Sequence, residues 1–387
     1  MSSRTRLLVF LVSTPLVLFV VVGGLLGATV SPPVQRGVPH LKVFDDVTSL
    51  IVNAYVEDVN VDKVFDGAMR GLVDGLDASS AYLTPEEVRA AESRTAAPTG
   101  DTGLIITKQF YLKVVGVRDG SPAQKLGFHT GDFLRAINNT PTRDMSAYAG
   151  TRLLQGAPGS KVTLLVLRGN AADPRPIDVT REAPQVTIAS AKRLSGGEAY
   201  LRIASFQSGT VDAIRASLTS LGAAAPANLI VDIRGVADGT PDDGIAVARL
   251  FVKTGVLATR TDRTGAKNVT NANTGDGGYA MPIALLVTDG TANGAEVFAA
   301  ALSGSKRATL IGEPTAGITG LQRLVKLPEG HGFWLTYARY LQADGSPLHE
   351  HGLRPTVPVA APNPGFDDPP STSDPILERA IQEVHKS

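Results

Sequence analysis

The stretch from residue 282 to residue 322 constrains the fold of this chain more than any other segment. It alternates short apolar runs, which are typical of buried strands, with an Ala-rich helix and glycine-bearing turns. The predicted order is strand 283–288, turn 289–291, helix 295–302, strand 309–312 and turn 314–320. A turn that leads from a strand into a helix can present backbone N–H groups to developing negative charge. Such a turn is therefore a common mount for a catalytic nucleophile.

Motifs in this stretch resemble the core of the C-terminal processing (tail-specific) serine peptidases. In that family the first turn reads roughly Ser-Ala-Ser-Ala-Ser-Glu and the second Thr-Phe-Gly-Lys-Gly-x-x-Gln. Aligned on Glu296, on residues 312–315 and on Gln322, the patterns match without gaps. The resemblance puts the nucleophilic serine of the family on Asn293 and its general-base lysine on Ile318.

The side chains at these two positions do not suit the family's chemistry. A serine–lysine dyad needs a hydroxyl that attacks a carbonyl and a neutral amine that takes its proton. The amide of Asn293 is a poor nucleophile, and Ile318 carries no proton acceptor. Because both partners are replaced at their expected positions, we expect this chain to lack the family's peptidase activity.

A second turn of the family is also altered. Residues 232–239 align with Asp-x-Arg-x-Asn-Pro-Gly-Gly, but Val236, Ala237 and Asp238 replace the asparagine, the proline and the first glycine. The resemblance implies that these glycines shape an oxyanion hole, of which only Gly239 is kept. A carboxylate at Asp238 that pointed inward would oppose the negative charge which such a hole stabilises. The nucleophile, the general base and the oxyanion turn of the expected site have thus all changed.

Composition limits the other classes of function. The 387 residues, 43% of them hydrophobic, suffice for two or three packed domains. The 37 basic and 37 acidic residues balance and form no basic stripe, so no nucleic-acid partner is indicated. The absence of cysteine excludes disulfides and thiolate metal sites. Residues 349–351, His-Glu-His, would put two imidazoles on one face of a strand, but a third ligand is missing, so we expect no cofactor.

The amino-terminal segment predicts a membrane anchor at residues 1–28. Residues 7–28 hold 22 residues without a charge, and a spanning helix needs roughly 20. A secretory signal peptide is the alternative, but its apolar region is normally about 7–15 residues long. Flanking basic residues barely orient the segment. The family resemblance implies that the bulk lies on the extracytoplasmic, periplasmic side of the cell membrane.

A helical region with a linker is expected at residues 29–100. Apolar side chains recur at three- and four-residue steps over 44–55, and a second helix is expected over 61–76. Thr84 before Pro85 is typical of an N-cap with proline at the first helical position. This region also resembles the helical region of the family. We expect it to brace the fold and to help dimerisation.

A PDZ domain is expected at residues 101–183. The motifs at 103–106, 120–123 and 126–132 carry the resemblance. Such a module binds an extended peptide along a sheet edge and holds the terminal carboxylate with backbone N–H groups of its opening loop. The expected peptide-binding residues are Gly103, Leu104, Ile105 and Ile106. Alternatively, the module only packs against the core.

The remaining chain predicts a tail-specific protease-like α/β core at residues 184–360. Strands and helices alternate, which favours a mainly parallel sheet. Alternating apolar residues from Phe333 to Tyr337 predict a late strand that pairs back on residues 324–327. Residues 361–387 form a Pro-rich tail with a terminal helix. The fold class is therefore α+β and multidomain.

Together these features predict a membrane-anchored, catalytically inactive homologue of the C-terminal processing peptidases. We expect it to bind protein C-termini, an active relative or a second copy of itself, as an adaptor or regulator. Two alternatives remain open. One is an active serine-type endopeptidase that cleaves proteins near their C-termini, in which residues that the sequence does not identify replace the dyad. Thr291 and Thr319 carry hydroxyls near the two positions, but turn and cap roles are commoner for such residues. The other is a structural subunit that binds no peptide.

Overall fold

The computed structural model describes residues 38–93, 100–169, 171, 173–222, 226–369 and 371–386. It divides into two compact units, with the boundary between Gly67 and Ala68. The predicted anchor at residues 1–28 lies outside the described residues. Among those described, no helix has both the length and the apolar character that crossing a bilayer requires.

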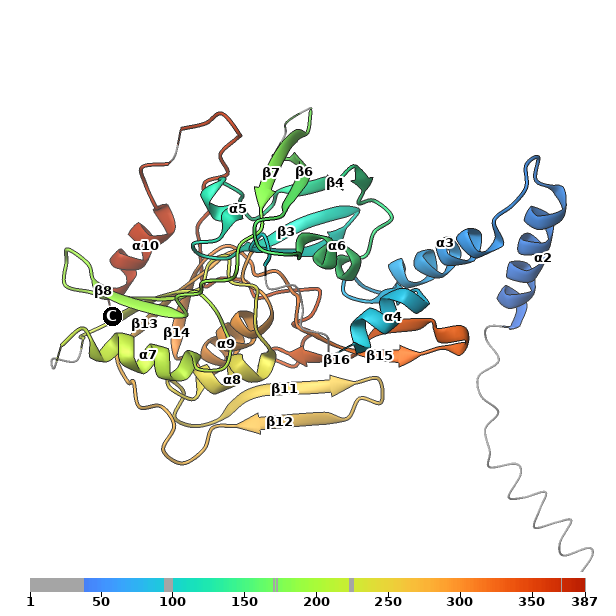
Figure 1. The fold of residues 1–387 in the computed structure, drawn as a ribbon. Helices are drawn as coiled ribbons and strands as arrows, with labels where there is room; N and C mark the ends of the chain where they lie inside the picture. Colours follow the sequence, from blue (N-terminus) through green and yellow to red (C-terminus); the bar gives the residue numbers. More distant parts are fainter. Residues whose placement is uncertain are drawn as a thin grey trace, which may run out of the picture. The chain divides into compact units, whose positions relative to one another are not determined.

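The described part of the first unit, residues 38–67, contains helices, as its periodicity predicts (Figure 1). It contains α2 (Val38–Ala54) and the first turns of α3 (Val61–Asp74). The second unit then adds the short strand β1 (Ala81–Leu83) and the helix α4 (Pro85–Glu92). The predicted cap of α4 is confirmed, because Glu87 N–H donates to the Thr84 hydroxyl while Thr84 N–H donates to the Glu87 carboxylate.

A five-stranded sheet with one added strand forms the predicted PDZ module. Its elements are β2 (Leu104–Gln109), β3 (Tyr111–Val117), α5 (Pro122–Lys125), β4 (Phe133–Ile137), β5 (Thr140–Pro141), α6 (Ala147–Leu154), β6 (Lys161–Leu167) and β7 (Arg175–Thr180). The strand order is β2-β3-β4-β6-β7, with β5 paired to β4. Strand β2 therefore lies at an edge of the sheet, next to α6. An edge strand is what peptide binding by strand addition requires.

The core has a six-stranded sheet in the order β17-β14-β13-β10-β9-β8. Its strands are β8 (Ala189–Arg193), β9 (Ala199–Ile203), β10 (Leu229–Asp232), β13 (Ile283–Val287), β14 (Ala308–Gly312) and β17 (Val357–Pro358). All neighbouring pairs are parallel except β8 with β9. The predicted, mainly parallel sheet is confirmed.

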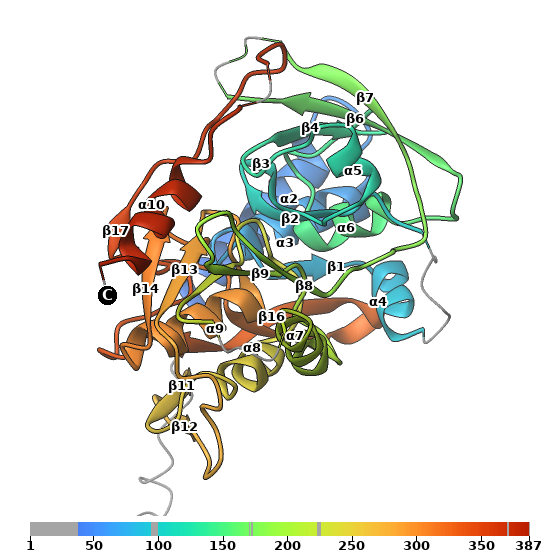
Figure 2. The ribbon, with the colours of Figure 1, turned by 90° about the vertical axis from the view of Figure 1, so that its left-hand side faces the viewer.

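Helices cover both faces of this sheet (Figures 1 and 2). They are α7 (Thr210–Thr219), α8 (Pro241–Ala248), α9 (Asn293–Gly304) and α10 (Pro375–Val384). Successive strand residues point to opposite faces. Val231 and Leu285 accordingly join the cluster that holds α7, α8 and α9, whereas Ile230 and Leu286 pack with α10. Both faces being covered explains why these strands are continuously apolar.

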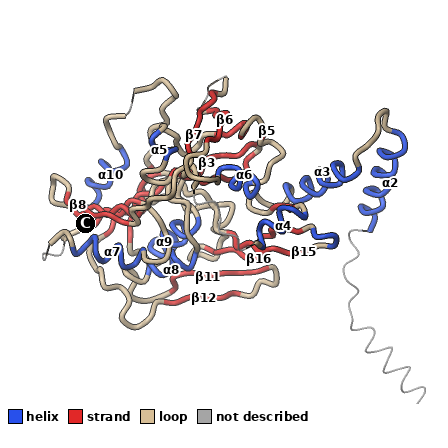
Figure 3. Tube along the Cα trace, in the orientation of Figure 1, coloured by secondary structure: helices blue, strands red, loops and turns tan. Residues whose placement is uncertain are grey.

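A second, antiparallel sheet has the order β1-β16-β11-β12, with β15 also paired to β16 (Figure 3). Its strands include β11 (Val256–Asp262), β12 (Lys267–Asn271), β15 (Gly320–Lys326) and β16 (Gly332–Leu341), and the 3-10 turn η1 (Pro328–Gly330) joins the last two. The predicted pairing of residues 324–327 with the late strand is confirmed, since Leu324 lies opposite Trp334. The hairpin of β11 and β12 was not predicted.

Candidate functional site

The turn between β13 and α9 carries Asn293, which has a left-handed φ of 49°. Thr291 builds this turn, because its hydroxyl donates to the carbonyl oxygen of Ile233 at 3.1 Å and accepts from Thr288 N–H at 3.1 Å. Thr291 is fully buried. Its hydroxyl therefore stabilises the turn, and it is not free to act as a nucleophile in place of the missing serine.

Asn293 makes two hydrogen bonds that bring three segments together. Its side-chain Nδ2 donates to the carbonyl oxygen of Ala237 at 2.6 Å. Its backbone N–H donates to the carbonyl oxygen of Ile318 at 2.9 Å. Residues 293 and 318 and the 232–239 turn, which sequence comparison had singled out separately, thus meet in one place.

Glu296 organises the loop that carries Ile318. Its fully buried carboxylate accepts from the Thr315 hydroxyl, from Gly317 N–H at 2.7 Å and from Ile318 N–H at 2.9 Å. Burial raises the pKa of Glu296 to about 7, and these three donors oppose that rise. The sequence held a signal for this role: a lone carboxylate in an otherwise apolar, Ala-rich helix.

Ile318 belongs to a small apolar cluster. Val115, Ala237 and Ala292 form its buried part, and Ile105, Ala316 and Ile318 pack against them. Val115 and Ile105 come from the PDZ sheet, whereas the others come from the core. The cluster is therefore shared between the two modules.

Asp238 and Gly239 occupy the turn expected to form an oxyanion hole. The Asp238 carboxylate accepts from the Ser205 hydroxyl and, at 3.2 Å, from Phe206 N–H. Burial raises the pKa of Asp238. Gly239 has φ +81°, and a Cβ there would lie 1.7 Å from the carbonyl oxygen of Phe206. The turn thus packs tightly on residues 205–206, and only glycine fits at 239.

Gln322 lies on β15 and is bonded away from Asn293 and Ile318. Its Nε2 donates to the carbonyl oxygen of Gly320 at 3.0 Å and to the Thr336 hydroxyl at 3.2 Å. The Thr336 hydroxyl in turn donates to Asp77 at 3.3 Å. Gln322 is therefore part of a network with the segment before β1.

A cavity of about 780 Å³ lies beside Ile318. The β2 residues Thr107 to Gln109 line it, together with Lys113, Asp289 and residues 313–318. The Lys108 ammonium donates to three backbone carbonyls, those of residues 142, 143 and 145. Lys113 pairs with Asp289 at 3.3 Å. Both lysines are thus engaged within hydrogen-bonding distance of oxygens.

The His349-Glu350-His351 pattern does not lie on a strand, so the reason for placing both imidazoles on one face was wrong. These residues form a turn in which His349 Nδ1 accepts from Thr319 N–H at 3.3 Å. The ring of His351 instead lies 3.0 Å from the carbonyl oxygen of His349. In the described part of the chain, no group of three His, Asp or Glu side chains is arranged to hold a metal ion.

The expected peptide-binding residues divide between two environments. Gly103 has φ +82°, and a Cβ there would lie 2.1 Å from the Ser121 Cβ. Leu104 and Ile106 are buried in the PDZ core, whereas Ile105 joins the cluster around Ala237. The strand itself remains at the sheet edge.

Comparison with known proteins decides the family. The family model for peptidase family S41 matches residues 198–359, and that for the PDZ domain matches residues 113–168. The chloroplastic C-terminal processing peptidase of Tetradesmus obliquus is 32% identical over 311 residues, which cover 75% of this chain and 67% of that protein. This chain belongs to the C-terminal processing peptidase family.

Further relatives agree with this assignment. The carboxy-terminal processing protease CtpA of Bacillus subtilis is 28% identical over 316 residues, or 81% of this chain and 67% of the relative. The solved structure of the photosystem II D1 C-terminal processing protease is 28% identical with a TM-score of 0.69. That match covers 82% of this chain and 92% of the other. The predicted family, PDZ module and protease core are confirmed.

Proposed function

We propose that this member of the C-terminal processing peptidase family does not hydrolyse peptides, and that it binds protein C-termini, or an active relative, as an adaptor or regulator. The observation that carries the proposal is the bonding of Asn293 and Ile318. The Asn293 amide donates to Ala237, and Ile318 packs in an apolar cluster. An amide and a hydrocarbon supply neither the nucleophile nor the base of a serine–lysine dyad.

The two lysines that line the cavity support the same proposal. A general base must reach the nucleophile within hydrogen-bond distance. Lys108 is held by three carbonyls of its own module, and Lys113 by Asp289. Neither is hydrogen-bonded to Asn293 or to Thr319 in the described residues. Thr319 is itself fully buried.

Peptide binding is supported by the position of β2. This edge strand borders the cavity through residues 107–109, so a peptide that pairs with β2 would extend along the cavity wall. In the opening loop, Gly103 N–H donates to the Asp101 carboxylate at 2.9 Å and Leu104 N–H donates to the Thr102 hydroxyl at 3.4 Å. A terminal carboxylate would bind there by taking the place of these acceptors. Strand pairing gives affinity for extended segments, and the loop gives preference for chain ends.

We further propose that residues 7–28 anchor the chain and that the described units lie on the extracytoplasmic side. The support is the uncharged length of the segment. Cell fractionation with a washed membrane pellet tests it: recovery of the full chain in the soluble fraction would contradict the anchor.

The test of inactivity is an incubation of the purified full chain with β-casein, an unstructured substrate, beside the double variant Asn293→Ser with Ile318→Lys. We expect no new fragments from the unmodified chain. Cleavage that persists in a preparation checked for contaminating proteases would support the endopeptidase alternative instead.

Binding is tested separately with a library of ten-residue peptides carrying free carboxylates and with its amidated counterpart. We expect retention of the free-carboxylate peptides. Absence of carboxylate-dependent retention would favour the structural subunit that binds no peptide.

A further inference from the structure

Strand β3 of the PDZ module lies directly on two turns of the core, residues 234–238 and 288–292, here called the core turns. A Cβ on Gly116 of β3 would lie 2.9 Å from the carbonyl oxygen of Gly235 and 3.0 Å from the Ala237 Cβ. A Cβ on Gly290 would lie 2.6 Å from the carbonyl oxygen of Val115. The two backbones therefore approach as closely as glycine permits. One core turn carries Ala237, which binds Asn293, and the other leads into Asn293.

Apolar side chains pack at this contact, next to the cavity of about 780 Å³. Val115, Ala237 and Ala292 are 3%, 1% and 0% exposed, and Ile105 and Ile318 pack against them. The contact is thus an apolar interface, in which Ile318 is contributed by the core and Ile105 by the peptide-binding strand. Residue 318 is half-buried and also borders the cavity of about 780 Å³, so a charged side chain there would turn toward the cavity and lose its packing against the cluster.

We infer that Ile318 is a hydrophobic latch, whose packing fixes the PDZ module of this chain over its core turns. The PDZ module then covers the place where Asn293 and Ile318 stand instead of the family's serine and lysine. The inference rests on the proposed function, since it gives the isoleucine a structural role in place of a catalytic one. As a consequence, a partner peptide binds to β2 while the PDZ module keeps its position on the core. Binding of the peptide does not separate the PDZ module from the core turns.

Polar contacts surround the latch. The Arg202 guanidinium of β9 donates to both carboxylate oxygens of Asp119, just after β3, at 2.9 and 3.0 Å. Arg202 also donates to Asp232 at 3.3 Å, so the pair continues into the core. Bidentate guanidinium–carboxylate pairs fix orientation as well as distance. They therefore oppose rotation of the PDZ module about the apolar contact.

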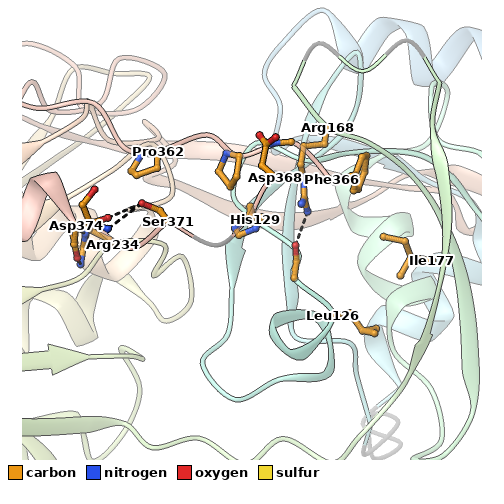
Figure 4. A pocket seen from close by; sticks show the side chains of 14 residues that line it. Leu126, His129, Arg168, Ile177, Arg234, Pro362, Phe366, Asp368, Ser371 and Asp374 are labelled. Carbon is orange, nitrogen blue, oxygen red and sulfur yellow. Dashed lines mark hydrogen bonds and ion pairs between the residues drawn. The ribbon is translucent and has the colours of Figure 1, made fainter.

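Residues 361–369 and 371–374, here called the strap, contact the same modules beside a cavity of about 650 Å³ (Figure 4). Its Phe366 ring lies under two guanidinium groups of the PDZ module, those of Arg168 at 4.5 Å and Arg175 at 4.8 Å. At its other end, Asp374 accepts from both terminal nitrogens of Arg234 at 2.7 and 2.9 Å. The PDZ module is thus held at the latch and by the strap.

Because the chain has no cysteine, an introduced pair reports on this contact alone. The reporter is Lys113→Cys with Asp289→Cys, whose native side chains are in contact across the interface. The measurement is the rate of cross-linking by a short bismaleimide. We expect Ile318→Lys to slow cross-linking about tenfold, and hydrogen exchange of the core turns to rise in the same variant.

Val325→Lys is the matched control, because it adds the same charge at a half-buried position of β15 outside the cluster. It should cross-link like the parent. If Ile318→Lys does not fold, Ile105→Ser removes the latch from the PDZ side and should give the same slowing.

Equal cross-linking in the parent and in every folded latch variant overturns the inference, and so does equal slowing by Val325→Lys. Cleavage of β-casein by the parent chain would refute the proposed inactivity while leaving the cross-linking result to decide the latch. The two failures are therefore distinguishable.

Discussion

The β2 edge of the PDZ module and the core turns around Asn293 differ in how their polar groups are satisfied. Strand β2 keeps one side outside any described sheet pairing and borders a cavity. The Asn293 side chain instead donates to Ala237, and the Glu296 carboxylate of α9 accepts from three donors in the loop of residues 315–318. Backbone groups left available favour ligands, whereas groups satisfied internally favour rigidity.

The largest expected effect tests the core turns around Asn293, whose polar groups are satisfied internally. Glu296→Ala leaves the Thr315 hydroxyl and the N–H groups of Gly317 and Ile318 without their buried acceptor. We expect a loss of about 4 kcal/mol in the free energy of unfolding, measured with urea. Glu296→Gln keeps one acceptor oxygen and should lose clearly less. If both variants lost the same small amount of unfolding free energy, Glu296 would not organise the loop that carries Ile318.

The pH dependence of stability gives the next effect. Burial raises the pKa of Glu296 from its ordinary value of 4.5 to about 7. A carboxyl group with a raised pKa in the folded state contributes stability below pH 4.5, and this contribution is lost as pH rises to about 7. The expected loss is about 3 kcal/mol at most.

The measurement is the urea unfolding of the parent minus that of Glu296→Gln, from pH 4.5 to pH 8. The subtraction matters because burial lowers the pKa of His129 and His349, whose contributions rise with pH. A difference that stays flat across this range contradicts a raised pKa at Glu296.

A smaller effect tests peptide binding at the β2 edge of the PDZ module. Amidating the terminal carboxylate of a retained peptide should weaken its binding about tenfold, or roughly 1.4 kcal/mol, since charge-assisted bonds to the opening loop are lost. Fluorescence anisotropy with labelled peptides measures this. Gly103→Ala, whose Cβ would meet Ser121, should abolish the difference between the two peptide forms. If Gly103→Ala still binds the free-carboxylate peptide more tightly than the amidated peptide, the opening loop does not bind the carboxylate.

The smallest effect concerns the ion pair between Lys113 and Asp289 at the border of the two regions. Its side chains are 24% and 46% exposed, so water screens their attraction. Lys113→Met should change the free energy of unfolding by roughly 0.5 kcal/mol. Lys125→Met, which removes the exposed pair with Glu182, is the matched control. A loss several times larger than the control's would show that this pair helps to hold the two modules together.

Local patterns predicted much of the fold correctly. The strand, turn and helix between 283 and 304 follow from an apolar run, turn residues and an Ala-rich segment. The capping box at Thr84 likewise depends only on residues close in sequence. By contrast, β12 is a polar edge strand, and β11 beside it is polar from Thr259 to Asp262, so their sequence carries little periodic signal.

The site was predictable only in part. Sequence alignment brought Asn293, Ile318 and residues 232–239 into one argument, and the structure places them in hydrogen-bonded contact. The direction of the Asp238 carboxylate toward Ser205 was not predictable, because those residues are 33 positions apart. Rotamer choice at such a place depends on neighbours that only folding supplies.

The sequence by itself determined the identity of the side chains that chemistry needs: an amide at 293 and a hydrocarbon at 318. Only the tertiary structure decided what those side chains do, joining one to Ala237 and packing the other near Ile105 and Val115. Reactivity is a property of covalent groups and can be read along a chain. Burial, hydrogen-bond partners and shifted pKa values arise from distant segments that meet in space.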